Sequence, residues 1–372
     1  MRFGFSEECL CHDPGPRHPE TPSRLEAIRE RLVQCHGVEY VEAPAVSVPQ
    51  IESAHDPAYV EEFRQFCADG GGDWDPDTVA VEATWDAARR SAGLACWAAR
   101  RALAGDDGRE TPFSLGRPPG HHAVSDDAMG FCFLNNVAIA AQCALGGQWP
   151  LDETIGTTST EGTDEATTTD ESAESPSTDS APTESADRVA IVDWDVHHGN
   201  GTQEIFESRG DVFVVSIHET GLYPGTGKAT EIGVGDGEGT TMNVPMPATA
   251  TDAGYLAALE TVIAPALGAF DPDLLLVSAG FDAHRHDPIS RVRLTTEAYA
   301  LLTDRLRSLA RETDAGVAFV LEGGYNLEVL ADSVAIVHET FDGREPIEPT
   351  DPVDDAVETT LDRVATAHGI ER

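Results

Sequence analysis

The chain has 372 residues, 40% of them hydrophobic, which is enough for one large α/β domain or two smaller ones around a substantial core. Its 66 acidic residues outnumber its 24 basic residues, and the formal net charge is −42. No basic stripe is available to neutralise phosphates, so direct binding to nucleic acid is not expected. An acidic surface with a single lysine, Lys228, stays hydrated in concentrated salt and indicates a halophilic source. Recruitment of a polycationic substrate is the alternative explanation of this charge.

The cysteines and the N-terminal residues indicate the compartment. The chain has seven cysteines, an odd number with no Cys-x-x-Cys pair, which argues against a disulfide framework and against a zinc ribbon. Residues 1–8 lack the apolar core of a signal peptide, and no stretch approaches the ~20 apolar residues that span a bilayer. We therefore expect a cytoplasmic protein with reduced cysteine thiols and no membrane partner. The sequence leaves its oligomeric state open.

The N-terminal part contains one clear helix, and the middle of the chain loses all regular pattern. An apolar stripe from Trp85 to Ala99, with Thr84 as its cap, predicts a helix over residues 84–103. Residues 146–187 are dominated by Thr, Ser, Glu and Asp and cannot bury enough surface to order themselves. We expect this segment to be a disordered acidic insert in a single domain of residues 1–342. An interdomain linker is the alternative.

Four short apolar runs lie between the predicted helices, and a second helical stripe is formed by Tyr299, Leu302, Leu306 and Leu309. The runs show no alternation of polar and apolar residues, which predicts a parallel sheet covered on both faces. They lie at residues 189–192, 212–215, 274–277 and 317–321. Residues 343–372 are predicted to form an acidic tail with a short helix from Asp354.

Polar residues of the kinds used in catalysis come directly after each run. They are Asp193 to Asn200, Ser216-Ile217-His218, Ser278 to His284, and Glu322 to Asn326. Parallel strands deliver such residues to the carboxyl edge of the sheet, where open α/β folds bind their ligands. The period of two puts Asp193, Asp195 and His197 on one side, and this mixed oxygen and nitrogen set suits a divalent metal such as zinc.

Two upstream loops add further candidates, at residues 117–122 and 130–136. The first carries two adjacent histidines on a Pro-Gly turn, and the second is a glycine and aromatic loop that enters a helix. Each motif alone has a plainer explanation: a His-His pair on a loop is usually exposed, and Tyr325 after two glycines is usually a loop aromatic. Their occurrence together at successive strand ends makes coincidence a poor explanation.

Taken together, these segments resemble the zinc-dependent histone deacetylase family, including its acetylpolyamine amidohydrolase and acetoin-utilisation relatives. The resemblance covers essentially the whole chain except the acidic insert and the tail. The Arg-Pro-Pro-Gly-His-His form and Asn200 are closer to the class II and prokaryotic branch than to class I. The resemblance implies an arginase-like three-layer α/β fold with a mostly parallel sheet of about eight strands flanked by helices.

The same resemblance implies a role for each site residue. Asp195, His197 and Asp282 would hold one zinc ion, and His122 would act as general base. Tyr325 would stabilise the oxyanion, because hydrolysis of an acetamide needs a donor for the developing charge. His121, paired with Asp193, would add electrostatic help, and Asn200 would orient His122.

The resemblance further implies a substrate channel and a structural monovalent-cation site for K+ or Na+. The channel would be lined by Pro119, Gly130, Phe131, Tyr223, Gly323 and Gly324, with Tyr223 standing where the family usually has phenylalanine. The cation site would comprise Asp193, Asp195, His197, Ser216 and Ile217, and a second site would lie near Phe206 and Val212. Arg24 either reaches the interior behind the metal or forms a structural salt bridge. His284 and His286 are expected to be loop residues rather than ligands.

An acetylated protein is the expected substrate, and a small acetylated amine is the alternative. In the polyamine-preferring eukaryotic branch a glutamate follows the Asp-Pro of the metal loop, whereas Ile289 follows Asp287-Pro288 here. Two other functions stay open: a two-metal ureohydrolase, which needs further acidic ligands, and a catalytically silent acetyl-lysine reader. The reader would be expected to lose a ligand, His122 or Tyr325, and the sequence retains them all.

Overall fold

The computed structural model describes residues 1–105, 111–150 and 185–372, and its centre is an eight-stranded sheet. All the strand pairs of this sheet are parallel, in the order β2-β1-β5-β10-β9-β6-β7-β8. The predicted fold class is therefore confirmed. The strands are β1 (Arg2–Gly4), β2 (Glu39–Val41), β5 (Pro112–Ser114), β6 (Val189–Asp193), β7 (Val212–Glu219), β8 (Thr241–Met246), β9 (Leu274–Ala279) and β10 (Gly316–Leu321). A separate antiparallel pair is formed by β3 (Gly71–Asp73) and β4 (Val79–Val81).

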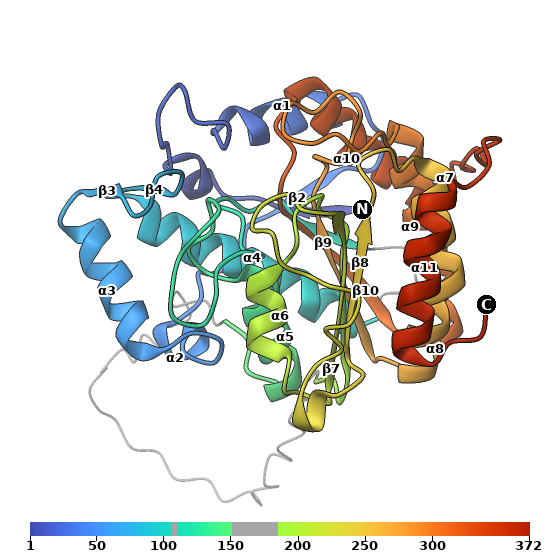
Figure 1. Ribbon diagram of the computed structural model, residues 1–372. Coiled ribbons are helices and arrows are strands. Elements are labelled where there is room, and N and C mark those ends of the chain that lie inside the picture. Colours follow the sequence, from blue (N-terminus) through green and yellow to red (C-terminus); the bar gives the residue numbers. More distant parts are fainter. Residues whose placement is uncertain (106–110, 151–184) are drawn as a thin grey trace, which may run out of the picture.

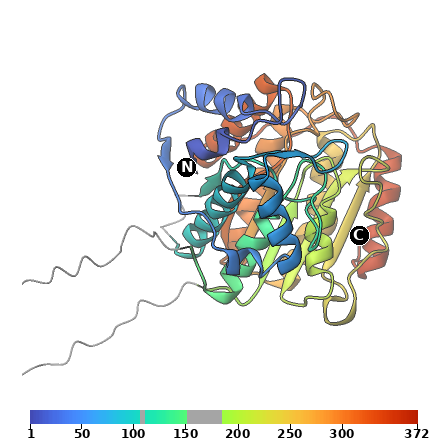
Figure 2. The same ribbon diagram turned by 90° about the vertical axis from the view of Figure 1, so that its left-hand side faces the viewer.

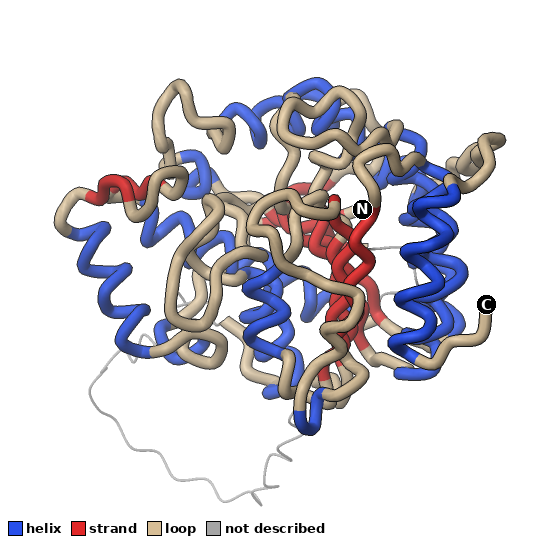
Figure 3. The backbone as a smooth tube through the Cα atoms, viewed as in Figure 1, coloured by secondary structure: helices blue, strands red, loops and turns tan. Residues whose placement is uncertain are grey.

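Helices cover both faces of the sheet and make three layers, as Figures 1 and 3 show. One face packs against α1 (Ser23–Leu32), α7 (Asp252–Ala258), a π-helical turn (Leu259–Ile263), α8 (Ala264–Phe270), α9 (Thr296–Glu312), α10 (Leu327–Phe341) and α11 (Asp355–His368). The other packs against α2 (Val48–Ile51), α3 (Pro57–Ala68), α4 (Thr84–Leu103), α5 (Asn136–Gly146) and α6 (Asn200–Phe206). Short 3-10 turns lie at Glu7–Leu10 and Gly235–Gly237.

The central strands are apolar throughout because both of their faces are buried. In β6, Ala190 and Val192 join the core on the α9 and α10 side, whereas Val189 and Ile191 join the core on the α4 and α5 side. Each of these side chains is at most 1% exposed. The alternation follows from the period of two in a strand, and it explains why the predicted strands could be recognised by unbroken hydrophobic runs.

The second predicted strand is longer than expected. Residues 216–218 were expected to follow it, but β7 continues to Glu219. Ser216 pairs with Asn243 of β8 and His218 with Pro245, so the ladder extends through these polar positions. The Ser216 hydroxyl also lies 3.1 Å from His218 Nδ1, which gives both buried side chains a partner inside the strand.

Helix α4 confirms the predicted helix at residues 84–103, but Thr84 is not its N-cap. The capping position is Ala83, and Thr84 is the first helical residue. The Thr84 hydroxyl instead accepts a hydrogen bond from the Val81 amide at 2.7 Å and lies 2.9 Å from His12 Nδ1. The side chain therefore ties the start of the helix to β4 and to the N-terminal segment.

The predicted acidic insert lies largely outside the described residues, and its two flanks are anchored to the fold. Gly146 ends α5, and the amide of the buried Ala186 donates to the Ala144 carbonyl at 3.0 Å. Figure 2 shows these flanks on one side of the molecule.

The C-terminal segment contains the helix that was predicted from Asp354. The Asp354 side chain caps α11 by accepting a hydrogen bond from the Ala356 amide at 2.8 Å. The apolar face of α11, which includes Val357, Leu361 and Val364, is buried in the core on the α9 side. This part of the predicted tail is therefore a component of the helical layer.

One helix is longer and more apolar than the sequence analysis allowed. The continuous helix Asp252–Phe270 has 19 residues and would suffice, by length and composition alone, to cross a membrane. Half of its most apolar window is buried inside the molecule, and the helix contacts both α9 and α11. These contacts are those of a helix that packs in a protein core.

Candidate metal and catalytic site

Neighbouring parallel strands bring the predicted polar segments to one edge of the sheet. β6 lies between β7 and β9, and β10 lies beside β9. Asp193, the last residue of β6, pairs with Ser216 of β7 on one side and with Ser278 of β9 on the other. The carboxyl ends of these strands therefore meet, as the sequence predicts.

Three predicted metal ligands form a compact buried group at this edge. Ligand atoms of Asp195, His197 and Asp282 all lie within 4.8 Å of one another. His197 Nδ1 is 2.9 Å from Asp195 Oδ1 and 3.1 Å from Asp282 Oδ2. Both carboxylates are fully buried, and His197 is 8% exposed.

The charges of this group fit a divalent cation. Two buried carboxylates face one imidazole, so at least one negative charge has no neutralising partner within the triad. Burial and the Asp195 carboxylate raise the pKa of Asp282 to about 7. Oδ2 of Asp282 accepts no hydrogen bond from any described residue, despite its closeness to His197. An orphaned carboxylate oxygen in an oxygen and nitrogen donor set is a suitable ligand for a metal such as zinc.

Backbone amides from several segments hold these carboxylates in place. Asp195 Oδ1 accepts from the His197 amide at 2.9 Å, and Oδ2 accepts from the Gly323 amide at 2.8 Å. Asp282 Oδ1 accepts from the Val196 amide at 2.9 Å. Backbone amides thus orient both carboxylates. The Asp195 contacts come from the adjacent turn and from the segment after β10, and the Asp282 contact comes from the segment after β6; such outer-shell contacts fix the ligands in metal sites.

Two glycines make room for the ligands. A β-carbon at Gly280 would lie 2.0 Å from Asp195 Oδ2, and one at Gly323 would lie 2.3 Å from Asp282 Oδ2. Neither carboxylate can retreat without losing its backbone hydrogen bond. Only a residue without a β-carbon fits at these two positions.

His121 is the charged member of the histidine pair. Its Nδ1 lies 2.8 Å from Asp193 Oδ2, and the side chain is buried. Burial would lower the pKa of His121, but the Asp193 and Asp195 carboxylates outweigh it and raise the pKa to about 10. The pairing of His121 with Asp193 that the sequence analysis expected is present.

His122 is the neutral member. Its Nδ1 lies 2.8 Å from Asn200 Oδ1, while Asn200 Nδ2 donates to the His122 carbonyl at 3.3 Å. Because the amide oxygen can only accept, Nδ1 carries the hydrogen and Nε2 keeps a free lone pair. Burial, and then the neighbouring His121 and His197, hold the pKa of His122 well below its usual value. The pair therefore places one imidazole that can accept a proton beside one that carries a lasting positive charge.

Tyr325 lies between an aromatic ring and a buried arginine. Its ring is 5.8 Å from that of Phe131, and the Arg24 guanidinium lies 5.0 Å over it. Burial raises the pKa of Tyr325 well above its usual value, so the hydroxyl stays protonated and can donate. Arg24 does both things that the sequence left open: it pairs with Glu20 at 3.0 Å and donates to the Gly324 carbonyl at 2.7 Å behind this loop.

Two aromatic rings flank these catalytic candidates. Tyr223 is 37% exposed and packs edge-on against His122 with ring centroids 5.1 Å apart. Phe131 is half-buried and contacts both Tyr325 and, at 4.6 Å, the ring of His18. The remaining residues that were predicted to line a channel are buried at the same place in the fold: Pro119, Gly130, Gly323 and Gly324.

The residues predicted for the monovalent cation also come together. Asp193 and Ser216 are partners across β6 and β7, and Ile217 follows in β7. Phe206 and Val212, expected near a second cation, are both buried in the core. His284 contacts the His286 amide at 3.2 Å and Thr296 Oγ1 at 3.3 Å, so it lies outside the ligand group.

Two carboxylates that the sequence analysis did not assign lie behind the catalytic loops. Asp287 Oδ2 accepts from the amides of Tyr325 at 2.7 Å and Asn326 at 3.0 Å. Glu322 accepts hydrogen bonds from the amide of Gly120, which precedes the histidine pair, and from the amide of His121. An acidic residue directly after an apolar strand was the available signal for Glu322, whereas Asp287 carried no signal beyond its position before a proline.

Comparison with known proteins agrees with this geometry. Residues 18–149 and 179–341 match the histone deacetylase domain family. The chain is 35% identical over 345 residues to histone deacetylase 10, chloroplastic, of Oryza sativa subsp. japonica, covering 88% of this chain and 70% of that relative. It is 32% identical over 380 residues to a histone deacetylase-like amidohydrolase of Pseudomonas aeruginosa, covering 96% and 89%. A probable deacetylase of Archaeoglobus fulgidus is 34% identical over 330 residues, covering 87% and 81%.

A solved structure shows the same fold. The crystal structure of the HDA15 HD domain matches with a TM-score of 0.82 at 32% identity, covering 99% of this chain and 96% of that one. The chain therefore belongs to the histone deacetylase family, which confirms the family predicted from the sequence. It is a deacetylase or amidohydrolase of that family.

Proposed function

We propose that the protein is a zinc-dependent deacetylase that hydrolyses an acetylated amine, foremost protein acetyl-lysine, to acetate and the free amine. The observation that carries this proposal is the buried group of Asp195, His197 and Asp282 beside the neutral base His122, whose ring centroid lies 5.8 Å from that of His197. Zinc held by these three residues would polarise the acetyl carbonyl and make a bound water more acidic.

The residues of the chain divide the remaining work. His122 takes a proton from the attacking water at its free Nε2 and returns it to the nitrogen of the departing amine. The Tyr325 hydroxyl donates a hydrogen bond to the oxyanion that develops on the carbonyl. His121 stays charged beside Asp193 and stabilises the same negative charge.

We further propose that a structural K+ or Na+ binds among Asp193, Asp195, His197, Ser216 and Ile217. Three strongly polar groups of this set are buried at adjoining strand ends, which supports a cation there. Tyr223 and Phe131 would contact the aliphatic part of the substrate.

We also propose a cytoplasmic location, where thiols stay reduced. The seven cysteines all lie in described residues and are free thiols, which supports this location.

An acetylated protein is preferred over an acetylated polyamine as substrate. The metal loop has the apolar, partly exposed Ile289 after Asp287-Pro288, at the position where a polyamine-specific enzyme of the eukaryotic branch has a glutamate. The test compares turnover of an acetyl-lysine peptide with that of acetylputrescine. We expect the peptide to be the better substrate, and a strong preference for acetylputrescine would overturn this ranking.

A two-metal ureohydrolase is the less favoured candidate. Such a site needs a second acidic ligand close to Asp282, and the residue two positions later is His284, which points to other partners. Purification in high salt, with metal content and acetate release measured on the same sample, separates the two functions. We expect one zinc per chain and released acetate, whereas two manganese ions per chain without acetate release would favour the ureohydrolase.

A further inference from the structure

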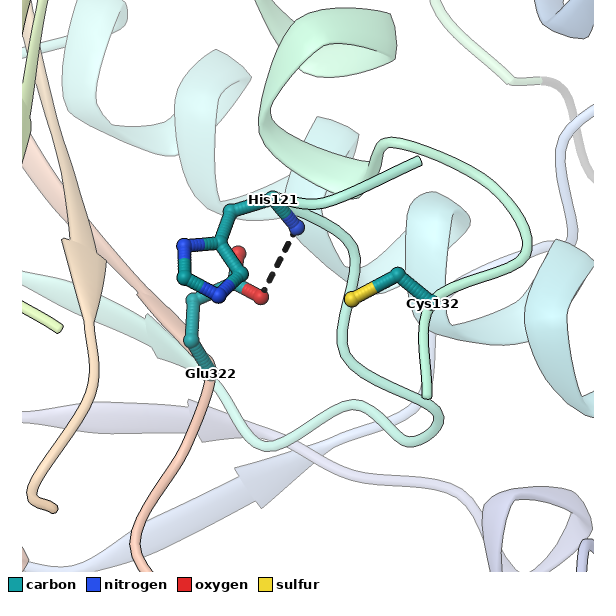
Figure 4. Close-up of side chains that lie close together, drawn as sticks. All are labelled: His121, Cys132 and Glu322. Atoms are coloured by element: carbon teal, nitrogen blue, oxygen red, sulfur yellow. Dashed lines mark hydrogen bonds between the residues drawn. The ribbon is translucent and has the colours of Figure 1, made fainter. Parts of the chain in front are cut away.

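Glu322 is a fully buried acidic residue that is not one of the expected metal ligands. It follows β10 directly, and its side chain lies against the histidine turn (Figure 4). Oε2 accepts a hydrogen bond from the Gly120 amide at 2.7 Å and another from the His121 amide at 3.2 Å. One carboxylate oxygen therefore binds two consecutive amides immediately before the proposed base, His122.

The other oxygen and the backbone of Glu322 fix the carboxylate itself. Oε1 accepts from the Ser278 hydroxyl of β9 at 3.1 Å. The Glu322 amide donates to the Ala279 carbonyl at 3.0 Å, and the Glu322 carbonyl accepts from the Arg24 guanidinium. These contacts tie Glu322 to the strand ends that carry the ligand group.

Loss of the Glu322 carboxylate would destabilise the turn that carries the two histidines. The amides of Gly120 and His121 belong to buried residues, so loss of the acceptor would leave two donors inside the protein without a partner. The turn would shift to find other acceptors, and the rings of His121 and His122 would shift with it.

The nearby thiol of Cys132 does not turn this cluster into a second metal site. Atoms of His121, Cys132 and Glu322 lie close enough for an ion. However, the Asp193 and Asp195 carboxylates outweigh burial and raise the pKa of His121 to about 10, so its ring carries a proton on each nitrogen and offers no lone pair to an ion. Burial also raises the pKa of Cys132 well above its usual value, which keeps the thiol protonated.

We propose that Glu322 is a positioning residue of the proposed deacetylase, whose hydrogen bonds hold the His121 and His122 turn in register with the loop of Tyr325. Since Tyr325 lies three residues after Glu322, one short segment fixes the proposed base and carries the proposed oxyanion donor. This inference rests on the proposed function only for its effect on turnover.

Two variants separate hydrogen bonding from charge. Glu322→Asp keeps the charge but shortens the side chain, so the carboxylate no longer reaches both amides. Glu322→Gln removes the charge but keeps an oxygen for the amides and an NH2 group that can donate to Ser278. We expect Glu322→Asp to lower kcat about 10- to 100-fold with little change in KM, because a small misplacement of a catalytic group costs rate on this scale. Glu322→Gln should recover most of that loss.

Asp273→Ala is the matched control. The Asp273 carboxylate also accepts two consecutive amides, from Asp187 at 2.8 Å and Arg188 at 2.9 Å, but at the opposite edge of the sheet. Its kcat should stay close to that of the wild type. Ser278→Ala is a milder variant of the same contact and should give a smaller loss in kcat of the same kind as Glu322→Asp.

The outcomes distinguish this inference from the proposed function. A Glu322→Gln protein that is as slow as Glu322→Asp would show that turnover requires the charge of Glu322 rather than its hydrogen bonds. An unchanged kcat in both Glu322→Asp and Ser278→Ala would show that turnover does not require the contact. Either result overturns the inference. If the wild type releases no acetate, the proposed function fails. Crystal structures then decide: a displaced 117–122 turn in Glu322→Asp supports positioning, and an unmoved turn overturns it.

Discussion

Nδ1 of His122 lies 2.8 Å from the amide oxygen of Asn200, whereas Nδ1 of the adjacent His121 lies 2.8 Å from a carboxylate oxygen of Asp193. The neutral amide and the charged carboxylate explain why neighbouring rings differ in protonation. An amide fixes the tautomer of His122 without stabilising its charged form. The protein thus has one imidazole that can accept a proton beside one that retains its own.

Asn200→Asp tests this contrast. A carboxylate at position 200 would stabilise protonated His122, so its pKa should rise and the base should be occupied by a proton at neutral pH. We expect a lower kcat/KM at pH 7 and an acid limb of the pH–rate profile that moves up by about one pH unit or more. The profile of acetate release between pH 5 and 10 checks this. An unshifted acid limb would argue against His122 as the base.

Tyr325→Phe removes the hydroxyl that we assign to the oxyanion. We expect kcat to fall by about 100-fold or more, the scale for loss of one oxyanion donor. Acetate release measures the effect. Tyr299→Phe is the control, because the buried Tyr299 hydroxyl has no hydrogen-bond partner among the described residues. Near-normal turnover in Tyr325→Phe would remove the role assigned to its hydroxyl.

Asp282→Asn should abolish metal binding. The substitution replaces one of the two buried carboxylates, with its orphaned oxygen, by a neutral amide, which is a poorer ligand for zinc. Metal analysis should find about one zinc per wild-type chain and almost none in the variant. Asp211→Asn, which alters a carboxylate paired with Arg209 on the surface, should keep its metal. Full zinc occupancy in Asp282→Asn would contradict the ligand assignment.

Glu20 should contribute stability that disappears in acid. It is fully buried between Arg117 and Arg24, and their charges and the His12 hydrogen bond overcome burial and hold the pKa of Glu20 well below 4.5. An acid whose pKa is lowered on folding stabilises the protein above its unfolded pKa and loses this effect as the pH falls below it. Glu20→Gln should cost about 3–5 kcal/mol at pH 7, because it leaves two buried arginines without their partner.

Urea unfolding in constant salt, between pH 3 and 7, measures this contribution. The difference in unfolding free energy between wild type and Glu20→Gln should be constant above pH 5 and should narrow below about pH 4.5. Glu61→Gln, which breaks an exposed pair with Arg64, should have little effect at any pH. A difference in unfolding free energy that widens as the pH falls would contradict the lowered pKa of Glu20.

Deletion of residues 151–184, with a short Gly-Ser linker in their place, should leave melting temperature and kcat close to wild type. The described flanks are anchored independently, by the Gln50 amide group on the Gln148 carbonyl at 3.0 Å before the segment and by the Arg188 amide on Asp273 at 2.9 Å after it. A shorter loop costs little or no additional closure entropy. Thermal melts and acetate release in the same salt check the result, and loss of folding would show that the segment is structural.

The sequence predicted those parts of the molecule that local patterns determine. Unbroken apolar runs predicted β6, β7, β9 and β10, and the polar residues beyond them predicted the edge at which the ligand group lies. The extension of β7 to Glu219 was missed because its polar residues are satisfied by pairing with β8, which no local pattern reports. Thr84 was misassigned as a cap because its partner Val81 lies in another element.

The carboxylates that hold the catalytic loops were also beyond local reasoning. Glu322 binds the amide of Gly120, 202 residues earlier in the chain, and Asp287 binds that of Tyr325, 38 residues later. Backbone amides carry no sequence signature, so an acceptor for them can be recognised only after the strands have been placed.

The tight space at Gly280 and Gly323 has a consequence for how this protein can vary. In a mutational scan, alanine would count as the mildest replacement at either position, yet the added methyl group must push a carboxylate oxygen out of the ligand group. Such variants should fold and still behave like ligand knockouts. Libraries that seek new acyl specificity should therefore keep these two residues fixed and diversify the exposed Tyr223 instead.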